Sequence, residues 1–186
     1  VCDGQKYNWS IWEMHLQPLG FVAILDFVHL VVYLYAAACA ALGRGTAAAW
    51  ALYERRLRQA WAGQVGPLVR GLREQGQRLG QPPKGCAEED PRGVVWEAVG
   101  YVENNRKRMD YPRYRKLGLP TSSASVESTI KRLNRRVKGS EKFWGEGGGE
   151  AILEIRAAYL SEEGRAGRYW AQPRPRGRAV GAGRLP

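Results

Sequence analysis

The sequence predicts an α/β chain that is mostly helical. A short, wholly apolar run, FVAIL at residues 21–25, is typical of a buried strand. Segments with apolar residues at helical spacing fill most of residues 30–108, and a further amphipathic segment occupies residues 121–139. We therefore expect a strand–helix–strand unit at the start, followed by an inserted helical module and by C-terminal helices.

The strand–helix–strand unit comes first. Residues 1–2 have the character of a strand end, and Asp3-Gly4 supplies a sharp exit because glycine tolerates unusual backbone angles. Residues 8–17 carry Trp and Leu at helical spacing, with Asn8 as the expected N-cap. Residues 21–25 form the second strand, which we expect to be buried on both faces. Such a unit is almost always a right-handed parallel crossover.

Three or four packed helices are expected next. The chain is expected to turn helical from Phe27 onward, and apolar residues mark the helices at residues 30–42, 46–62, 65–79 and 93–108. Residues 21–42 are also about long enough to span a membrane, but Asp26 and His29 interrupt the run. A charge at that depth costs about 2.5–3.5 kcal/mol. We therefore expect no membrane partner, and a membrane-associated basic protein is kept only as a third alternative.

Residues 121–139 (TSSASVESTIKRLNRRVKG) are predicted to form a helix with two different faces. Ser122 or Ser123 can cap its start, and Gly139 can end it. Its apolar stripe consists of Val126, Ile130, Leu133 and Val137. Its polar stripe consists of Glu127, Lys131, Asn134 and Lys138, beside Arg135. One face should pack on a core while the other presents one acid among several cations. A second helix is expected at about residues 149–160.

Positive charge is concentrated in the second half of the chain. Residues 1–104 carry ten Lys/Arg and ten Asp/Glu, whereas residues 105–186 carry nineteen and eight. The whole formal net charge of +11 therefore lies beyond residue 104, which suggests a polyanionic partner such as nucleic acid. A solubilising basic tail is the alternative. The Arg-rich tail, residues 164–186, is expected to be disordered beyond Gln172.

The first residue and the cysteines indicate the cellular context. The chain starts at Val1 without an initiator Met or a secretory signal, so we expect it to be a piece of a longer protein. Its cysteines, Cys2, Cys39 and Cys86, share no metal-ligand spacing. They are interpreted as thiols of a reducing compartment, and the protein is expected to be cytoplasmic.

Two acids stand at the predicted strand ends. Neighbouring parallel strands lie about 4.8 Å apart and leave a sheet at the same edge, so Asp3 and Asp26 are expected to converge there. Clustered carboxylates repel one another unless a cation joins them, and oxygen ligands suit Mg²⁺ or Mn²⁺. The alternative is that both acids only cap the helices that follow their strands.

These motifs also resemble a known enzyme family. The order Asp3-Gly4, then Asp26-Phe27-Val28-His29, then a helical insertion, then Ser125-Val126-Glu127, resembles the DDE transposases, whose catalytic domain has an RNase H-like fold. Residues 109–144 (MDYPRYRKLGLPTSSASVESTIKRLNRRVKGSEKFW) are similar to the ISKra group of bacterial insertion-sequence transposases. Later matches fall at residues 151–161 and 168–170, so the likeness covers nearly the whole chain up to its Arg-rich tail.

The resemblance implies roles for particular residues. Asp3 would be the second catalytic Asp and Glu127 the final Glu, and both would bind metal. Asp26 and His29 match a D-x-x-H motif and would support the acids. The residues expected to contact DNA are Lys131, Asn134, Arg135, Lys138 and Lys142. The first catalytic Asp would lie upstream of Val1, so this piece is expected to bind metal weakly and to cut no DNA.

The implied activity is DNA transposition by phosphoryl transfer with two Mg²⁺ or Mn²⁺ ions about 3.5–4 Å apart. The partners would be transposon ends, target DNA and further copies of the chain on DNA, in a nucleoid-associated protein. The expected divisions are a partial RNase H-like core, a helical insertion, the Glu-bearing part of the core and a basic tail, at residues 1–29, 30–108, 109–163 and 164–186. The main alternative is a helical nucleic-acid-binding protein without catalysis.

Overall fold

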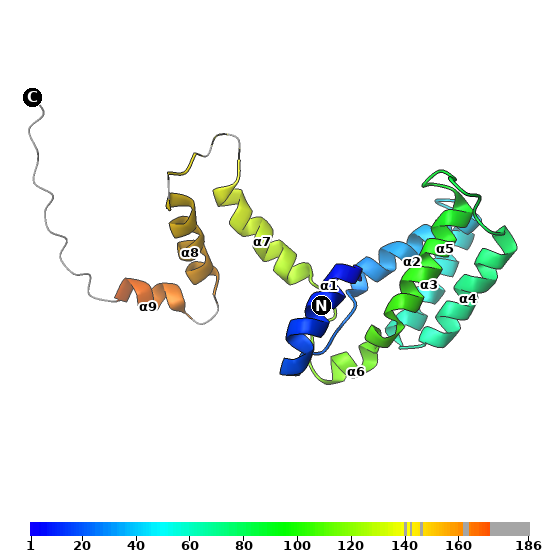
Figure 1. Cartoon of the computed structure of the whole chain (residues 1–186), viewed down its shortest axis with the longest axis horizontal. Coiled ribbons are helices and arrows are strands. Elements are labelled where there is room, and N and C mark those ends of the chain that lie inside the picture. The colour runs from blue at the N-terminus through cyan, green and yellow to red at the C-terminus, as the bar shows by residue number, and fades with distance from the viewer. Residues whose placement is uncertain (140, 142, 146, 162–163, 172–186) are drawn as a thin grey trace, which may run out of the picture. The chain divides into compact units, whose positions relative to one another are not determined.

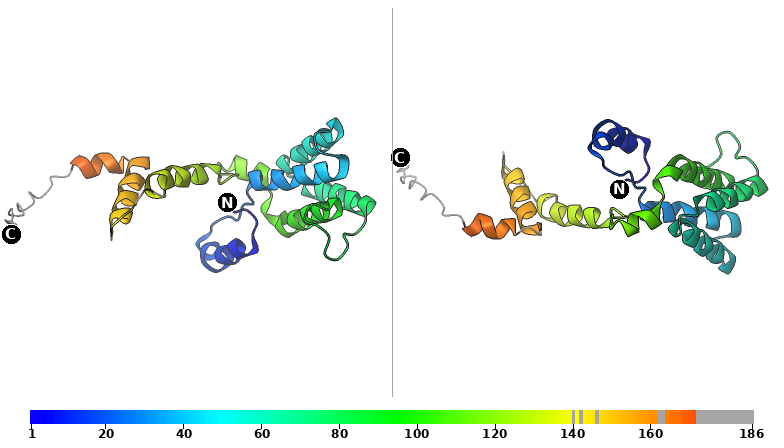
Figure 2. Two further views of the ribbon diagram at one scale, coloured as in Figure 1. Left: turned by 90° about the horizontal axis from the view of Figure 1, so that it is seen from above. Right: turned by 90° about the horizontal axis from the view of Figure 1, so that it is seen from below.

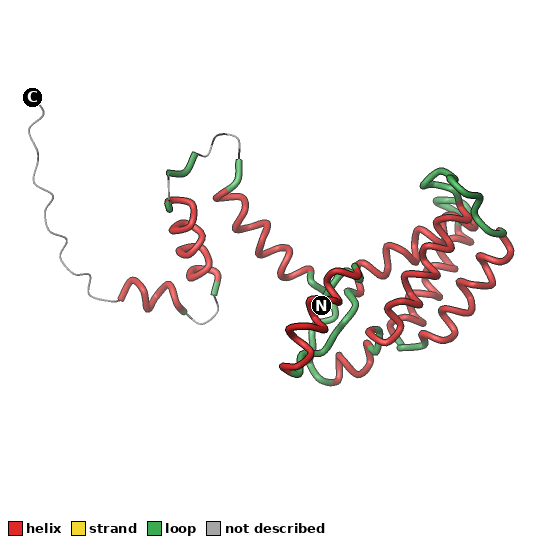
Figure 3. The backbone as a smooth tube through the Cα atoms, in the orientation of Figure 1, coloured by secondary structure: helices red, strands yellow, loops and turns green. Residues whose placement is uncertain are grey.

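The computed structural model describes residues 1–139, 141, 143–145, 147–161 and 164–171 of the chain (Figure 1). The chain divides into two compact units, residues 1–124 and residues 125–186. These units differ from the four segments expected from the sequence, which stay a prediction. As predicted, the chain is mostly helical, and Figure 3 shows helices and loops over the described residues.

The first unit contains most of the helices. They are α1 (Lys6–Ile11), the π-helical turn η1 (Trp12–Leu16), the 3-10 turn η2 (Gln17–Leu19), α2 (Phe27–Leu42), α3 (Ala47–Trp61), α4 (Val65–Leu79), α5 (Pro91–Asn105), the 3-10 turn η3 (Arg106–Arg108) and α6 (Tyr111–Lys116). The four helices predicted between residues 30 and 108 are thereby confirmed as α2 to α5. The first of them begins at Phe27, as predicted, because Asp26 caps it.

A bundle of α2, α3, α4 and α5 forms the core of this unit. α2 and α4 each pack against α3 and α5, and both views of Figure 2 show the four helices side by side. Leu30 and Leu34 of α2 are fully buried, as are Leu68 and Leu72 of α4, because apolar residues four apart share one helix face. Gly76 lets α5 approach closely, since a Cβ there would lie 2.9 Å from the Trp96 ring. Apolar burial along these faces therefore holds the bundle together.

The two predicted strands are not formed as strands. Within the described residues, β pairing is limited to one isolated parallel bridge between Cys2 and Leu25. The pairing stops there because Gly4, at φ +92°, turns the chain away immediately after Asp3. The run at residues 21–25 is also not buried on both faces, because Phe21 is 59% exposed while Leu25 is fully buried. The strand end predicted at residues 1–2 and the strand predicted at residues 21–25 are therefore not supported.

The helix predicted at residues 8–17 starts earlier and ends differently. α1 begins at Lys6, and Asn8 lies inside it rather than at its cap. The helix widens into the π turn η1 and then tightens into η2, where Pro18 provides no amide donor for further helical bonds. Gly20, at φ +81°, ends the turn in the left-handed region. Trp9 is the buried residue of α1 and holds it to the bundle.

The second unit consists of α7 (Ala124–Val137), which starts at the last residue of the first unit, α8 (Gly148–Leu160) and α9 (Arg165–Ala171). The two predicted C-terminal helices are therefore confirmed as α7 and α8. Gly139 does not end α7 in the left-handed conformation, because its φ of 159° is extended. The disorder expected beyond Gln172 stays a prediction, because residues 172–186 lie outside the described residues. Over the described part of the chain, every helix is too short or too polar to cross a membrane.

Candidate functional site

Asp3 and Asp26 both follow the bridge between Cys2 and Leu25. The Cys2 amide donates to the Ile24 carbonyl at 3.0 Å, and the Asp26 amide donates to the Cys2 carbonyl at 2.8 Å. Because the two segments run parallel, the two acids leave them at equivalent positions. The catalytic role expected of Asp3 and the supporting role expected of Asp26 stay predictions.

The Asp26 carboxylate joins the start of α2 to the end of the first unit. Its Oδ1 accepts from the amides of Val28 at 2.7 Å and His29 at 3.4 Å, so Asp26 is the N-cap of α2. Its Oδ2 accepts from the amide of Ser123 at 2.8 Å and from the Ser123 hydroxyl. Since Asp26 is only 1% exposed, four donors compensate a carboxylate that water hardly reaches.

These contacts determine the protonation of Asp26. Burial by itself raises the pKa of the carboxyl, but the hydrogen bonds from Ser123, Val28 and His29 outweigh it. The net pKa lies below the ordinary value of 3.8. The side chain is therefore an anion at neutral pH, as a metal-supporting carboxylate must be.

His29 lies in the first turn of α2 beside Asp26. Its Nδ1 is 3.5 Å from Asp26 Oδ2, while the side chain as a whole is 43% exposed. At that distance the two groups interact electrostatically, but His29 adds no close hydrogen bond to the carboxylate. The imidazole is thus placed next to Asp26 with part of the ring facing solvent.

The Asp3 carboxylate is less fully engaged than that of Asp26. Its Oδ1 accepts from the amide of Gln5 at 3.0 Å and from Asn8 Nδ2 at 2.9 Å, which stabilises the turn into α1. Its Oδ2 takes no hydrogen bond from the described residues. That oxygen is a suitable ligand atom for Mg²⁺ or Mn²⁺, which prefer carboxylate oxygens. Both oxygens of Asp26, by contrast, accept hydrogen bonds.

Tyr101 of α5 is a neighbour of both acids that the sequence did not reveal. Its hydroxyl donates to the Asp3 carbonyl at 2.7 Å. Its ring lies directly against Gly4, where a Cβ would come within 2.8 Å of Tyr101 Cε2. Burial raises the pKa of Tyr101, and the charges of Tyr33, Asp3 and Asp26 raise it further, so the phenol stays protonated as a donor. The bonded residues are 98 positions apart, a separation that helical periodicity cannot indicate.

The other predicted site residues belong to the second unit or lie outside the described residues. Glu127 is exposed in the first turn of α7. Farther along α7 lie Lys131, Asn134 and Arg135, and Lys138 follows its last residue. Lys142 lies outside the described residues. Lys131 follows Glu127 by four positions, so both face the same side of α7. A site that Glu127 shares with Asp3 stays a prediction.

No protein-family model, curated protein or solved structure matches this chain. A functional interpretation therefore rests on the residues and on their placement. Three observations bear on it: the parallel approach of Asp3 and Asp26, the helical bundle between Asp26 and Glu127, and the cations of α7.

Proposed function

We propose that this chain is the C-terminal portion of an ISKra-group DDE transposase and contributes two of the three acids of its catalytic centre. The observation that best supports this is the parallel bridge before Asp3 and Asp26, with a helical insertion between Asp26 and Glu127. This is the order of parts expected for a partial RNase H-like core. By itself the chain binds DNA and is inactive in cleavage.

Each residue has a defined task in this proposal. Asp3, through Oδ2, and Glu127 hold Mg²⁺ or Mn²⁺. When bound, these cations supply Lewis-acid activation of the attacking and leaving oxygens. Asp26 keeps the turn before α2 in place through Ser123, and His29 stands beside Asp26. The residues that contact the phosphates of transposon ends and target DNA are Lys131, Asn134, Arg135, Lys138 and Lys142.

The proposed location of the protein is the bacterial cytoplasm at the nucleoid, without a membrane partner. There it assembles with further copies of itself on DNA. The second candidate function is DNA binding without catalysis, which the charge asymmetry alone would explain. The two functions differ in what they require of Glu127.

Glu127→Gln in the longer transposase that contains the upstream acid tests this difference. The substitution keeps the size of the side chain but removes its charge, so we expect divalent-metal-dependent DNA cleavage to be lost and DNA affinity to be retained. Cleavage of a labelled transposon-end duplex with Mg²⁺ or Mn²⁺ measures the first, and a gel-shift titration measures the second. The control is Glu141→Gln, the same chemical change outside α7, which should cleave normally. Unchanged cleavage by Glu127→Gln would favour the non-catalytic alternative.

A further inference from the structure

A second group of cations belongs to the first unit rather than to α7. Residues 106–116 contain six Lys/Arg and one acid, Asp110. The cations are Arg106, Lys107, Arg108, Arg113, Arg115 and Lys116. They occupy η3 and α6, and we call residues 106–116 the basic segment. The sequence pattern assigned DNA contacts to α7 and Lys142 only, so these cations have no role in the proposal above.

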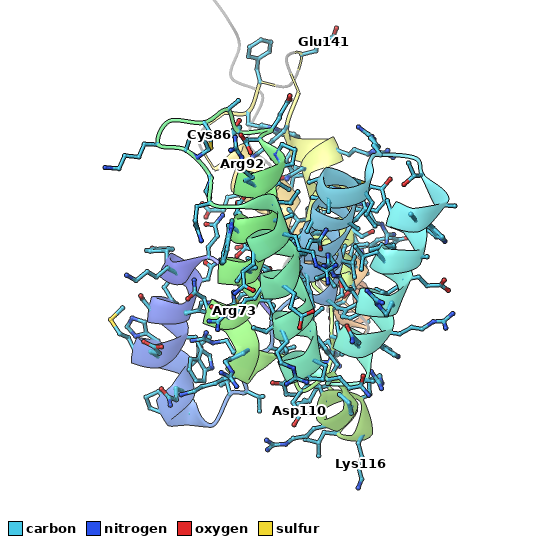
Figure 4. All side chains as sticks on the ribbon, turned by 90° about the vertical axis from the view of Figure 1, so that its right-hand side faces the viewer. Arg73, Cys86, Arg92, Asp110, Lys116 and Glu141 are labelled. Atoms are coloured by element: carbon cyan, nitrogen blue, oxygen red, sulfur yellow. The ribbon has the colours of Figure 1, made fainter. Side chains whose placement is uncertain are left out.

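The basic segment accounts for all the excess charge of the first unit. Residues 1–104 carry ten Lys/Arg and ten Asp/Glu, and residues 105–124 carry six and one. The rest of the unit is therefore electrically balanced, and the positive field of the unit originates from one short stretch. Figure 4 shows Asp110 and Lys116 at one end of this unit, with Cys86 and Arg92 at the other end.

The backbone of the basic segment is fixed to the core. Met109 and Tyr111 are fully buried, and Tyr114 is 3% exposed. The Tyr111 hydroxyl donates to the Leu25 carbonyl at 3.1 Å, and the Leu25 amide donates to the Arg108 carbonyl at 2.9 Å. Because the apolar and aromatic side chains point into the core, the segment presents its cations from a rigid support.

Two of the arginines are held by tryptophan rings. Arg108 lies 4.3 Å from the centroid of the Trp9 ring, and Arg115 lies 3.9 Å from that of Trp61. Arg115 Nη1 also donates to the Trp61 carbonyl at 3.0 Å. Stacking already restricts the rotation of these two side chains. They therefore lose less conformational entropy than a flexible arginine would when a ligand binds. These two guanidinium groups are therefore preorganised.

The other four cations are available for a ligand. Arg106, Lys107, Arg113 and Lys116 are exposed, and no described carboxylate forms an ion pair with them. The carboxylate of Asp110 instead accepts from the Arg113 amide at 3.3 Å as the N-cap of α6. These four side chains are thus cations without an acidic partner among the described residues, whereas Arg108 of the segment pairs with Glu13 at 3.6 Å.

We propose that the basic segment binds the phosphate backbone of duplex DNA as a second contact surface, separate from the cations of α7. This inference rests on the proposed function, because it takes DNA as the partner. A membrane surface fits less well, because membrane-bound helices need a broad apolar face. Here the tyrosines are buried, and Leu117 is the exposed large apolar residue next to the segment.

Salt-dependent DNA binding by the full 186-residue chain tests the proposal. The test variant combines Arg106→Gln, Lys107→Gln, Arg113→Gln and Lys116→Gln. The charge-matched control combines Arg55→Gln, Arg58→Gln, Arg70→Gln and Arg78→Gln, four exposed arginines of α3 and α4. Fluorescence anisotropy with a labelled DNA duplex gives Kd as a function of salt. Each lost phosphate contact reduces the magnitude of the slope of log affinity against log salt concentration by about 0.9. This magnitude should therefore fall by about 3 to 4 in the test variant and by less than about 1 in the control.

Further variants separate the possible outcomes. Lys107→Gln with Lys116→Gln should lose about half of that slope change, which keeps the test usable if the fourfold variant melts early in circular dichroism. Equal losses of slope in the test and control variants would overturn the proposal, because net charge alone would then explain binding. A slope reduced only by Lys131→Gln with Lys138→Gln would also overturn it, yet leave the proposed transposase function standing. If the parent chain bound no duplex, or bound only vesicles of anionic phospholipid, both proposals would fail.

Discussion

Asp26 combines two tasks at the scale of one residue. One oxygen caps α2, and the other accepts two hydrogen bonds from Ser123. A neutral amide could perform the first task but not the second, because its NH₂ group would face the Ser123 amide as donor against donor. The charge of Asp26 is therefore needed for the link to Ser123 rather than for the helix cap.

Asp26→Asn should destabilise the chain by about 1–3 kcal/mol at neutral pH, because the partly buried backbone amide of Ser123 loses its acceptor oxygen. The pKa of Asp26 is lower in the folded state than in the unfolded state. Its stabilising effect is thus fully present above about pH 4, the region of the ordinary carboxyl pKa, and is lost as pH falls through the lower folded pKa. Urea unfolding of the parent chain and of Asp26→Asn at a series of pH values measures the difference in their free energies of unfolding. This difference should narrow only below about pH 4.

Asp110→Asn is the matched control for this change. Asp110 also caps a helix, α6, but is exposed and has no second segment to hold. Asn caps helices about as well as Asp, so the variant should unfold within about 0.5 kcal/mol of the parent. A similar loss for both variants would mean that capping, not Ser123, explains the effect of Asp26.

At the scale of elements, α5 holds the N-terminal segment in place. Asn105, 2% exposed, accepts from Trp9 Nε1 at 2.8 Å and donates to the Tyr101 carbonyl at 2.9 Å. Tyr101 in turn donates to the Asp3 carbonyl. One helix thereby fixes both α1 and the turn that carries Asp3, so the position of this acid depends on a polar network buried beneath it.

Asn105→Ala should cost about 2–3 kcal/mol, because it leaves the Trp9 indole N–H buried without an acceptor and opens a small cavity. Guanidinium unfolding followed by tryptophan fluorescence measures the change. Its neighbour Asn104 is exposed, and Asn104→Ala should change stability by no more than about 0.5 kcal/mol. If both variants unfolded alike, the network would not hold α1.

Helical periodicity was sufficient to predict most of the helices. The strands predicted at residues 1–2 and 21–25, however, form only one isolated bridge. α2 to α5 bury residues at spacings of three and four, and that pattern is visible in the sequence. Residues 21–25 look like a strand because all are apolar and because they include Phe21, Val22 and Ile24, residue types that are common in strands. Strand formation also needs pairing along the length of the segment, which only tertiary contacts provide, and Gly4 ends the pairing after one bridge.

At the scale of the whole molecule, all the buried hydrophobic side chains among the described residues lie between Trp9 and Tyr114. The hydrophobic core therefore belongs to the first unit. Near the end of this unit, Ser123 also contributes to its structure by donating hydrogen bonds to Asp26. Burial of apolar area is the main source of folding free energy, so the stability of the chain should reside in residues 1–124.

Truncation after Ala124 should thus leave the thermal unfolding midpoint within about 3 °C of that of the full chain, a change below about 1 kcal/mol. Truncation after Thr121 removes Ser123 and should lower the midpoint by several degrees more, because Asp26 loses two donors. Calorimetry of the three proteins measures both shifts. A large loss on truncation after Ala124 would show that the second unit contributes to the core.

The candidate site could be predicted from the sequence only at its acids. Asp3 and Asp26 are recognisable because each follows an apolar segment and precedes a helix. Tyr101 and Asn105 sit on α5 among apolar residues, and nothing in their spacing indicates that they reach Asp3 and Trp9. Contacts between distant parts of a chain depend on how helices pack, and one sequence does not specify that packing.

The extended residues 23–26 and Phe27, the first residue of α2, also influence the order in which the chain folds. Their hydrogen bonds lead to Cys2, Arg108 and Thr121, and the buried bond to Tyr111 joins residues 86 positions apart. Helices of the bundle pair with sequence neighbours and can nucleate early, whereas this segment must wait for long loops to close. Its contacts should be largely absent from the transition state, so Tyr111→Phe should speed unfolding and hardly slow refolding. The edge that carries Asp3 and Asp26 would be the last part of the unit to assemble and the first to open.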